Sequence, residues 1–243
     1  MGHYLHPWGI ALQIIALVHL VRRRGAYYWF FVIFFGGFLG AIVYILVEIL
    51  PDVYLLRNAF EGHGRRARIK VVETAILDNP SVANYEELGD LLREEKQFAK
   101  AREAYDRAIS VRSDSEYTFY HRALCALELN DFAGAVADLE LVVGKDGKFD
   151  SYRAAALLAH AYAVTGNVER AAALFEDVSQ HSTTPETFYN YASFLKSQNR
   201  PAEAREWAQN LLDKKRTMPR YFQRIERPWF VKAKAMLKEL GTA

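Results

Sequence analysis

Seven histidines and one cysteine are the side chains of this sequence that most often do chemistry, and they are scattered along its 243 residues. No two histidines stand in a His-Glu-x-x-His arrangement, the helix-borne pattern of many zinc sites. The sequence also contains no Gly-x-Gly-x-x-Gly, no Gly-Lys-Ser/Thr phosphate loop and no paired cysteines. We therefore expect no cofactor, no bound metal and no enzymatic activity.

The charge and the cysteine content argue against a nucleic-acid-binding protein and exclude an intramolecular disulfide. Lysine and arginine exceed the acidic residues by only 2, so the chain lacks the strong basic field that nucleic-acid binding requires. A single cysteine cannot form an intramolecular disulfide. Cys125 lies between Leu124 and Ala126, and we expect it to be a small core residue. The predicted partner is a protein or peptide and not a nucleic acid.

Small residues recur at a fixed spacing in the second half of the chain. Four stretches align so that each has Gly or Ala in a first segment and Ala twelve residues later. The first small residues follow one another at intervals of 34, 36 and 33 residues. Antiparallel helices approach most closely where their side chains are small, so the pattern predicts four helix–turn–helix units. The pairs are Gly89 with Ala101, Ala123 with Ala135, Ala159 with Ala171, and Ala192 with Ala204.

This period resembles that of the tetratricopeptide repeat family, which implies an all-α solenoid. Large apolar residues beside each small one are expected to fill the core. We divide the chain into a membrane hairpin (1–52), a linker with a degenerate leading repeat helix (53–80), four repeats (81–213) and a basic C-terminal capping helix (214–243). The expected core residues are Tyr85, Leu88, Phe98, Tyr105, Phe119, Phe132, Leu139, Leu158, Tyr162, Phe175, Phe188, Leu195 and Leu211.

The same resemblance implies a protein-binding scaffold whose concave groove is lined by the first helix of each repeat. Family members that clamp a C-terminal carboxylate use Lys, Asn and Arg there, and Glu86 and Asp90 do not fit that role. A groove that is acidic at one end and aromatic in the middle suits a peptide or helix with an apolar face and basic residues. The tyrosines could equally pack between helices. The predicted groove residues are Glu86, Asp90, Tyr117, Tyr120, Leu124, His160, Tyr189, Ser193 and Lys196.

The N-terminal segment predicts a helical hairpin in a membrane. Residues 26–50 are apolar except for Glu48, long enough to span a bilayer, and we expect Pro51 to end that helix. Residues 7–21 form a shorter apolar stretch, and Gly25 would allow a tight turn between the two. His19 is either a residue at headgroup level or a functional intramembrane histidine. Close helix–helix contact in the membrane is expected at Gly36, Gly37 and Gly40.

The hairpin resembles the two-helix segment that precedes phospholipase D-type nuclease and cardiolipin synthase domains. The residues that carry this resemblance are IIALVHLVRRR, Trp29 and GAIVYIL, within residues 8–50. That family's catalytic signature is His-x-Lys-x4-Asp, and no histidine here is followed two residues later by lysine. The resemblance therefore implies an anchor without the chemistry.

The basic residues bear on the orientation of this anchor. Residues 22–24 are three arginines between the two apolar stretches, and the positive-inside rule places them in the cytoplasm. With two full spans, the repeats would then lie on the exterior (periplasmic) side of a bacterial cytoplasmic membrane. Basic residues after the second stretch favour the opposite side. These are Arg57, Arg65, Arg66, Arg68 and Lys70.

Residues 214–238 are basic, with Tyr221, Phe222, Trp229 and Phe230 interleaved. They are either a contact for anionic lipid or an acidic partner, or the solvated face of a capping helix.

Two functions remain open for the whole chain. The first is a non-enzymatic membrane-anchored scaffold that binds a partner through the concave surface. The alternative is an accessory subunit of a membrane lipid- or polymer-synthesising enzyme, docked through the hairpin.

Overall fold

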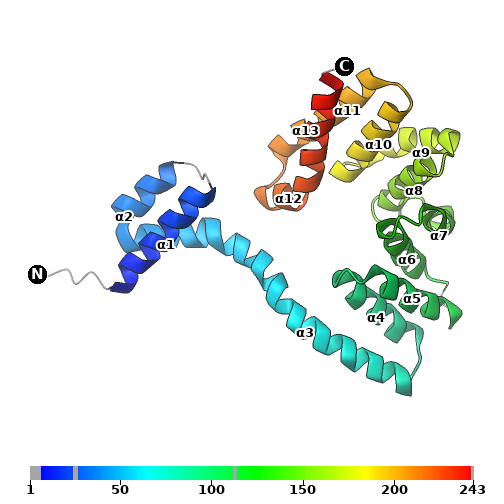
Figure 1. The fold of residues 1–243 in the computed structure, drawn as a ribbon, viewed down its shortest axis with the longest axis horizontal. Coiled ribbons are helices and arrows are strands. Elements are labelled where there is room, and N and C mark those ends of the chain that lie inside the picture. Colours follow the sequence, from blue (N-terminus) through cyan, green and yellow to red (C-terminus); the bar gives the residue numbers. More distant parts are fainter. Residues whose placement is uncertain (1–6, 24–26, 112–113, 242–243) are drawn as a thin grey trace, which may run out of the picture. The chain divides into compact units, whose positions relative to one another are not determined.

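The structure of the chain is a computed structural model, which describes residues 7–23, 27–111 and 114–241. His3, His6 and Gly25 lie outside these residues. All regular elements in the described residues are helices (Figure 1). The chain divides into two compact units, Met1–Arg65 and Arg66–Ala243, and each is described by itself.

The second unit contains the four predicted helix–turn–helix pairs. In each pair the two helices pack against each other, and each second helix but the third contacts the next first helix extensively. The pairs are α4 (Val82–Glu94) with α5 (Phe98–Ser110), α6 (Glu116–Glu128) with α7 (Phe132–Lys145), α8 (Arg153–Val164) with α9 (Val168–His181), and α10 (Pro185–Ser197) with α11 (Pro201–Thr217).

The small residues lie where they were predicted, at the crossing of the two helices of each pair. All seven alanines of the pattern have no exposed surface, and Gly89 is buried as well. A Cβ atom added at Gly89 would lie 2.6 Å from the ring of Tyr105, so only glycine fits against that ring. The spacing of small residues in the sequence is thus explained by the close approach of paired helices.

The turn inside each pair has the same backbone conformation in all four repeats. Two residues before the second helix, the chain adopts a positive φ, with angles of 59°, 59°, 83° and 58°. Glycine and asparagine enter this left-handed region at low cost, whereas lysine does not. The residues concerned are Lys96, Asn130, Gly166 and Asn199.

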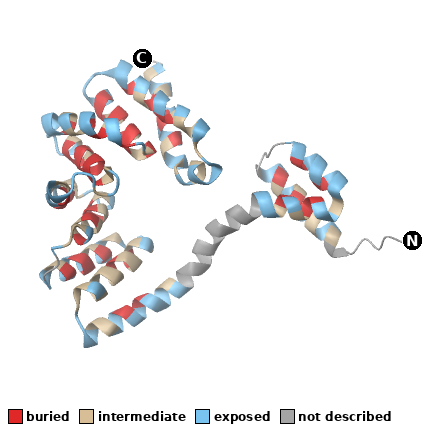
Figure 2. Cartoon of the chain, turned by 180° about the vertical axis from the view of Figure 1, so that it is seen from behind, coloured by how far each residue is buried: buried red, intermediate tan, exposed pale blue. Residues whose placement is uncertain are grey.

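The core of the repeats is built from the predicted large side chains (Figure 2). Tyr105, Leu139, Phe175, Leu195 and Leu211 have no exposed surface. Leu158, Tyr162 and Phe188 are also buried. The remaining predicted core residues are half-buried along the same contacts: Tyr85, Leu88, Phe98, Phe119 and Phe132.

Helices at both ends complete the second unit. The C-terminal part of α3 (Leu50–Asp78) carries Ile69 and Val72, both buried, and Ile69 packs in the core of the first repeat. At the other end, a short helix α12 (Arg220–Ile225) precedes α13 (Arg227–Gly241), whose Phe230, Ala233 and Met236 are buried. The basic segment 214–243 is therefore three pieces, because α11 continues to Thr217.

The first unit consists of α1 (Pro7–Arg23), α2 (Tyr28–Tyr44), a π-helical turn (Ile45–Ile49) and the start of α3. Residues 26–50 were expected to form a membrane-spanning helix. The described part of this stretch is not one continuous helix, because Gly37 has φ 56° and ψ −136° and breaks α2. The rings of Trp29 and Tyr44 lie 5.4 Å apart, whereas fifteen residues of continuous helix would separate them by about 22 Å. The chain therefore doubles back at Gly37.

Pro51 does not end a helix as predicted, since α3 runs from Leu50 through Pro51. Proline lacks the N–H that would continue the helical hydrogen bonds, and the π-helical turn Ile45–Ile49 lies directly before α3. By length and composition alone, Tyr28–Val47 is long and apolar enough to cross a membrane, and Gly9–Arg22 is a shorter apolar helix.

Candidate functional site

The first helices of the repeats, α4, α6, α8 and α10, line one side of the curved array, and the second helices α5, α7 and α9 line the other (Figure 1). We call the side of α4, α6, α8 and α10 the inner surface. The nine predicted groove residues all belong to these four helices. The contacts of these residues define three parts of the inner surface: an acidic end, a central polar cluster and a C-terminal end covered by α13.

At the acidic end, the carboxylate of Asp90 joins the first two repeats. Its two oxygens accept hydrogen bonds from the hydroxyls of Tyr105, at 2.7 Å, and Tyr117, at 2.6 Å. Burial and the neighbouring Asp90 raise the pKa of both phenols well above their usual value, so they stay protonated donors. Glu86 likewise accepts from the hydroxyl of Thr118 on α6. These two acids hold α4 to α6, and Tyr117 remains 40 % exposed beside them.

Three tyrosine rings surround His121 next to this end. The centroid of its ring lies 4.1 Å from that of Tyr117, 5.3 Å from that of Tyr120 and 6.1 Å from that of Tyr105. Its Nδ1 atom is buried and makes no hydrogen bond to any residue that the structure describes. Burial first, and then the charge of Arg93, lower the pKa of His121 to about 4. The imidazole is therefore neutral at physiological pH.

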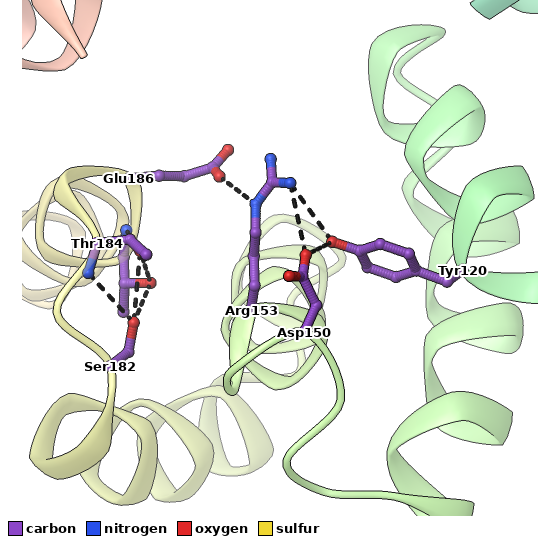
Figure 3. Close-up of polar contacts among 7 residues, drawn as sticks. Tyr120, Asp150, Arg153, Ser182, Thr184 and Glu186 are labelled. Atoms are coloured by element: carbon purple, nitrogen blue, oxygen red, sulfur yellow. Dashed lines mark hydrogen bonds and ion pairs between the residues drawn. The ribbon is translucent and has the colours of Figure 1, made fainter. Parts of the chain in front are cut away.

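A central polar cluster links three successive repeats (Figure 3). The Tyr120 hydroxyl donates to Asp150 at 2.6 Å, and the Arg153 guanidinium lies 3.4 Å from that hydroxyl and 3.7 Å from Asp150. On its other side, Nε of Arg153 donates to Glu186 at 3.0 Å. Arg153 thus stands at the start of α8 between a tyrosine of α6 and a carboxylate of α10. Burial lowers the pKa of Arg153 but the surrounding acids outweigh it, so the net direction is upward and the charge is fixed.

The turn between α7 and α8 positions Asp150 for these contacts. Asp150, Ser151 and Tyr152 have φ angles of 48°, 55° and 67°, three consecutive left-handed residues without a glycine. Each such residue costs roughly 1–2 kcal/mol. The cost is offset by the hydrogen bond from Tyr120 and by Tyr152, whose ring stacks on His181 at 4.8 Å between centroids.

The C-terminal end of the inner surface is covered by the capping helix. Lys196 of α10 pairs with Glu239 of α13. Tyr189 lies 5.6 Å from the ring of Trp229, and Nζ of Lys232 lies 5.5 Å from the Tyr189 ring. In the fourth repeat, contacts with α13 therefore occupy part of the face that the sequence assigned to a partner.

The remaining predicted residues differ in exposure. Tyr120 is buried rather than exposed, with 4 % of its surface accessible, because Phe149 packs against its ring and Asp150 binds its hydroxyl. Leu124 is half-buried against the core of the second repeat. His160 meets the edge of Phe132 at 5.9 Å, and burial lowers the pKa of His160. Ser193 is half-buried on α10.

Sequence analysis missed His121, Asp150, Arg153 and Glu186. The interval of 36 residues between the second and third small residues was the available signal, since it places a longer turn before α8. In α2, a Cβ atom at Gly40 would lie 2.0 Å from the Val32 carbonyl oxygen, whereas one at Gly36 would meet nothing within 4 Å. The close contact of Gly40 is therefore between the two arms of α2.

The described residues hold no group of three or more His, Cys, Asp or Glu side chains that could bind a metal ion. Cys125 is buried, and burial raises the pKa of its thiol to about 11, so it is an unreactive core residue. The side chains of the inner surface present hydrogen-bonding groups, charges and aromatic rings.

The chain resembles known proteins in its repeats. Residues 82–115 match the tetratricopeptide repeat family model. A search of the curated proteins found no match. Among solved structures, YrrB, a TPR protein with an unusual peptide-binding site, is similar with a TM-score of 0.59 at 16 % identity over 76 % of this chain and 88 % of that one.

Two further solved structures show the same arrangement. MamA from Desulfovibrio magneticus RS-1 has a TM-score of 0.59 at 13 % identity, covering 69 % of this chain and 96 % of that one. PilW, a type IV pilus biogenesis factor, has a TM-score of 0.56 at 15 % identity, covering 79 % and 90 %. At these identities the likeness establishes the fold alone. Residues 82–115 thus match the tetratricopeptide repeat model, and the helical array that they begin has the tetratricopeptide solenoid fold.

Proposed function

We propose that this chain is a non-enzymatic scaffold, anchored in a bacterial cytoplasmic membrane by residues 1–52, that binds a protein partner on the inner surface of its repeats. Tetratricopeptide arrays are typically protein-binding scaffolds, which supports the class. The observation that carries the proposal is the preorganised inner surface between α4 and α10. There Asp90 and Arg153 are each held by several partners while Tyr117 stays partly exposed.

The charges of this surface indicate the chemistry of the partner. Four carboxylates and two guanidiniums lie along α4, the α7–α8 turn, α8 and the start of α10, which leaves an excess of negative charge. Complementary charge and the partly exposed aromatic ring of Tyr117 favour a peptide or helix with basic residues and an apolar face. A surface already fixed by hydrogen bonds loses little conformational entropy on binding, which favours affinity. The charged residues are Glu86, Asp90, Asp150 and Glu186, with Arg93 and Arg153.

Site-specific photocrosslinking in intact cells tests this proposal. A photoreactive phenylalanine analogue at position 117 should form an adduct of one defined mass with the partner. The matched control is position 141 on the outer helix α7, where Leu141 is 51 % exposed. Adducts of equal yield at both positions, or none at 117 while the array stays folded, would contradict binding on the inner surface.

The membrane anchor also bears on the alternative function, an accessory subunit of a membrane enzyme docked through the hairpin. That alternative relied on glycines exposed for contact with another helix. Gly40 lies against the Val32 carbonyl within α2 and Gly37 forms the bend beside Gln13, so Gly36 is the predicted glycine left for an external helix. Copurification of a membrane enzyme that is lost in a Gly36→Leu variant would support the alternative function over the scaffold.

The basic C-terminal segment is a second surface, for which we propose contact with anionic lipid. The Nζ atom of Lys214 lies 4.4 Å from the centre of the Phe188 ring, and that of Lys232 lies 4.2 Å from the centre of the Trp229 ring. Two of the positive charges of this segment are therefore packed on aromatic rings. Tyr221 and Phe222 on α12 are exposed beside these charges. A fragment of residues 66–243 should float with vesicles that contain phosphatidylserine and remain behind with neutral vesicles. Equal recovery with both would leave α13 as a solvated capping helix.

A further inference from the structure

The bend of α2 determines where the chain leaves the first unit. Gly37 divides α2 into an arm from Tyr28 to Gly36 and a returning arm to Tyr44, which the ribbon in Figure 1 follows. The returning arm passes so close to the first that Gly40 lies against the Val32 carbonyl. The contact between the rings of Trp29 and Tyr44 shows that the two arms begin and end at the same level.

Polar side chains of α1 support the bent arrangement. The Gln13 amide donates to the Ile33 carbonyl oxygen at 3.3 Å and lies beside Gly37. Backbone broken inside a bilayer is tolerated where protein groups satisfy it, and Gln13 does so here. At the other end of the arms, Nδ1 of His19 lies 2.9 Å from the Tyr44 hydroxyl. This contact fixes the returning arm next to the end of α1, where Arg22 follows.

Much of α2 is exposed (Figure 2), and its large exposed side chains are aromatic or aliphatic. Phe35, next to the bend, is 80 % exposed, and no residue from Tyr27 to Val47 is charged. An arm of nine residues is about 13 Å long, less than half of a hydrocarbon core of about 30 Å. The tip at Gly36 therefore reaches the middle of a bilayer and does not reach its far side. The exposed apolar side chains of the two arms are Phe30, Phe31, Val32, Phe34, Phe35, Phe38, Leu39 and Val43.

We propose that α2 is a re-entrant helix that enters one leaflet of the bilayer and returns, so that the repeats lie on the cytoplasmic side together with Arg22. This inference rests on the proposed membrane anchoring. It replaces the exterior placement, which required α2 to cross. The bilayer is the occupant that the apolar surface requires, since the arms are uncharged over the whole inserted length.

The re-entrant arrangement also removes a conflict in the distribution of charge. A crossing α2 would separate the arginines that follow α1 from the basic start of the second unit and place one group outside. With both ends of α2 on one side, both groups lie in the cytoplasm and satisfy the positive-inside rule. The second group consists of Arg66, Arg68 and Lys70, with Arg65 directly before them.

Cysteine labelling of the full chain in intact cells tests the placement. Ala202 is exposed at the start of α11, and an Ala202→Cys variant should react with a membrane-impermeant maleimide only after the cells are permeabilised. The matched control is the unaltered chain, because its Cys125 is buried and should stay unlabelled. Labelling of Ala202→Cys in intact cells, with the chain in the membrane fraction, would overturn the re-entrant placement and leave the anchor standing. Recovery of the chain in the soluble fraction would overturn both proposals.

A second pair of variants tests whether the bend sets the side. Leucine at positions 37 and 40 cannot adopt the bent backbone or fit beside Val32, so a Gly37→Leu/Gly40→Leu variant should form one continuous helix and cross. Its Ala202→Cys form should then be labelled in intact cells. Gly36→Leu, where a Cβ meets nothing, should leave labelling as in the parent. Unchanged protection of the double variant while it remains in the membrane would refute the bend as the determinant.

Discussion

Removal of Arg122 should destabilise the repeats more than removal of any exposed charge. Its Nε and Nη2 atoms donate to the two oxygens of Asp138 at 2.8 and 2.5 Å, and its Nη1 atom donates to Asp106 at 2.6 Å. Asp138 is only 4 % exposed, so Arg122→Ala leaves a carboxylate buried without its cation. Breaking such a pair on one side costs about 3–5 kcal/mol.

The control is Arg170, which pairs with Glu140 at 3.0 Å with both side chains largely in solvent. Exposed pairs of this kind contribute below about 1 kcal/mol. In urea unfolding of residues 66–243, a slope near 2 kcal/mol/M converts these costs into midpoint shifts of about 2 M for Arg122→Ala and below about 0.5 M for Arg170→Ala. An Arg122→Met/Asp138→Leu variant should regain most of the loss, because it leaves no buried charge. Equal midpoints for the two alanine variants would refute this reasoning.

Three further predictions concern single positions. Gly89→Ala should lower the free energy of unfolding by about 1–3 kcal/mol, because its Cβ meets the ring of Tyr105. The control Gly144→Ala, whose Cβ lies in open space on α7, should raise the free energy of unfolding slightly. Thermal melts of the two variants test this difference. Lys96→Asn should stabilise by about 1 kcal/mol in urea unfolding, since asparagine tolerates the left-handed turn. The fold should lose stability as the pH falls from 6.5 toward 4, because an unfolded histidine binds a proton that His121, with a pKa of about 4, does not. His121→Phe should weaken that dependence in melts at pH 5 and 7.

The repeat array could be predicted because its determinants are local in the sequence. Each helix crossing requires a small residue, so Gly89 and Ala123 mark their own crossings and the interval between them gives the period. The large core residues then follow from helical spacing. Asn130 and Gly166 are residue types that favour the left-handed turn between paired helices, whereas Lys96 is not.

The central cluster could not be predicted because it depends on one irregular turn. The hydrogen bond between Tyr120 and Asp150 depends on a turn of three left-handed residues, 150–152. None of these residues is a glycine, so their types do not predict that conformation. The resemblance placed Tyr120 in the groove, with packing between helices as the alternative. The longer turn brings Phe149 over its ring, so Tyr120 is packed and not exposed. Hydropathy likewise reports the apolar content of residues 28–47 and not their direction, so the bend at Gly37 was invisible.

The position of Arg153 has a consequence for how the array opens. In a linear repeat protein each unit contacts only its neighbours, and local opening can spread one unit at a time. Arg153 belongs to the third repeat and touches Tyr120 of the second and Glu186 of the fourth. The backbone amides of α6, α8 and α10 should therefore exchange hydrogen at similar rates, as expected of one cooperative block.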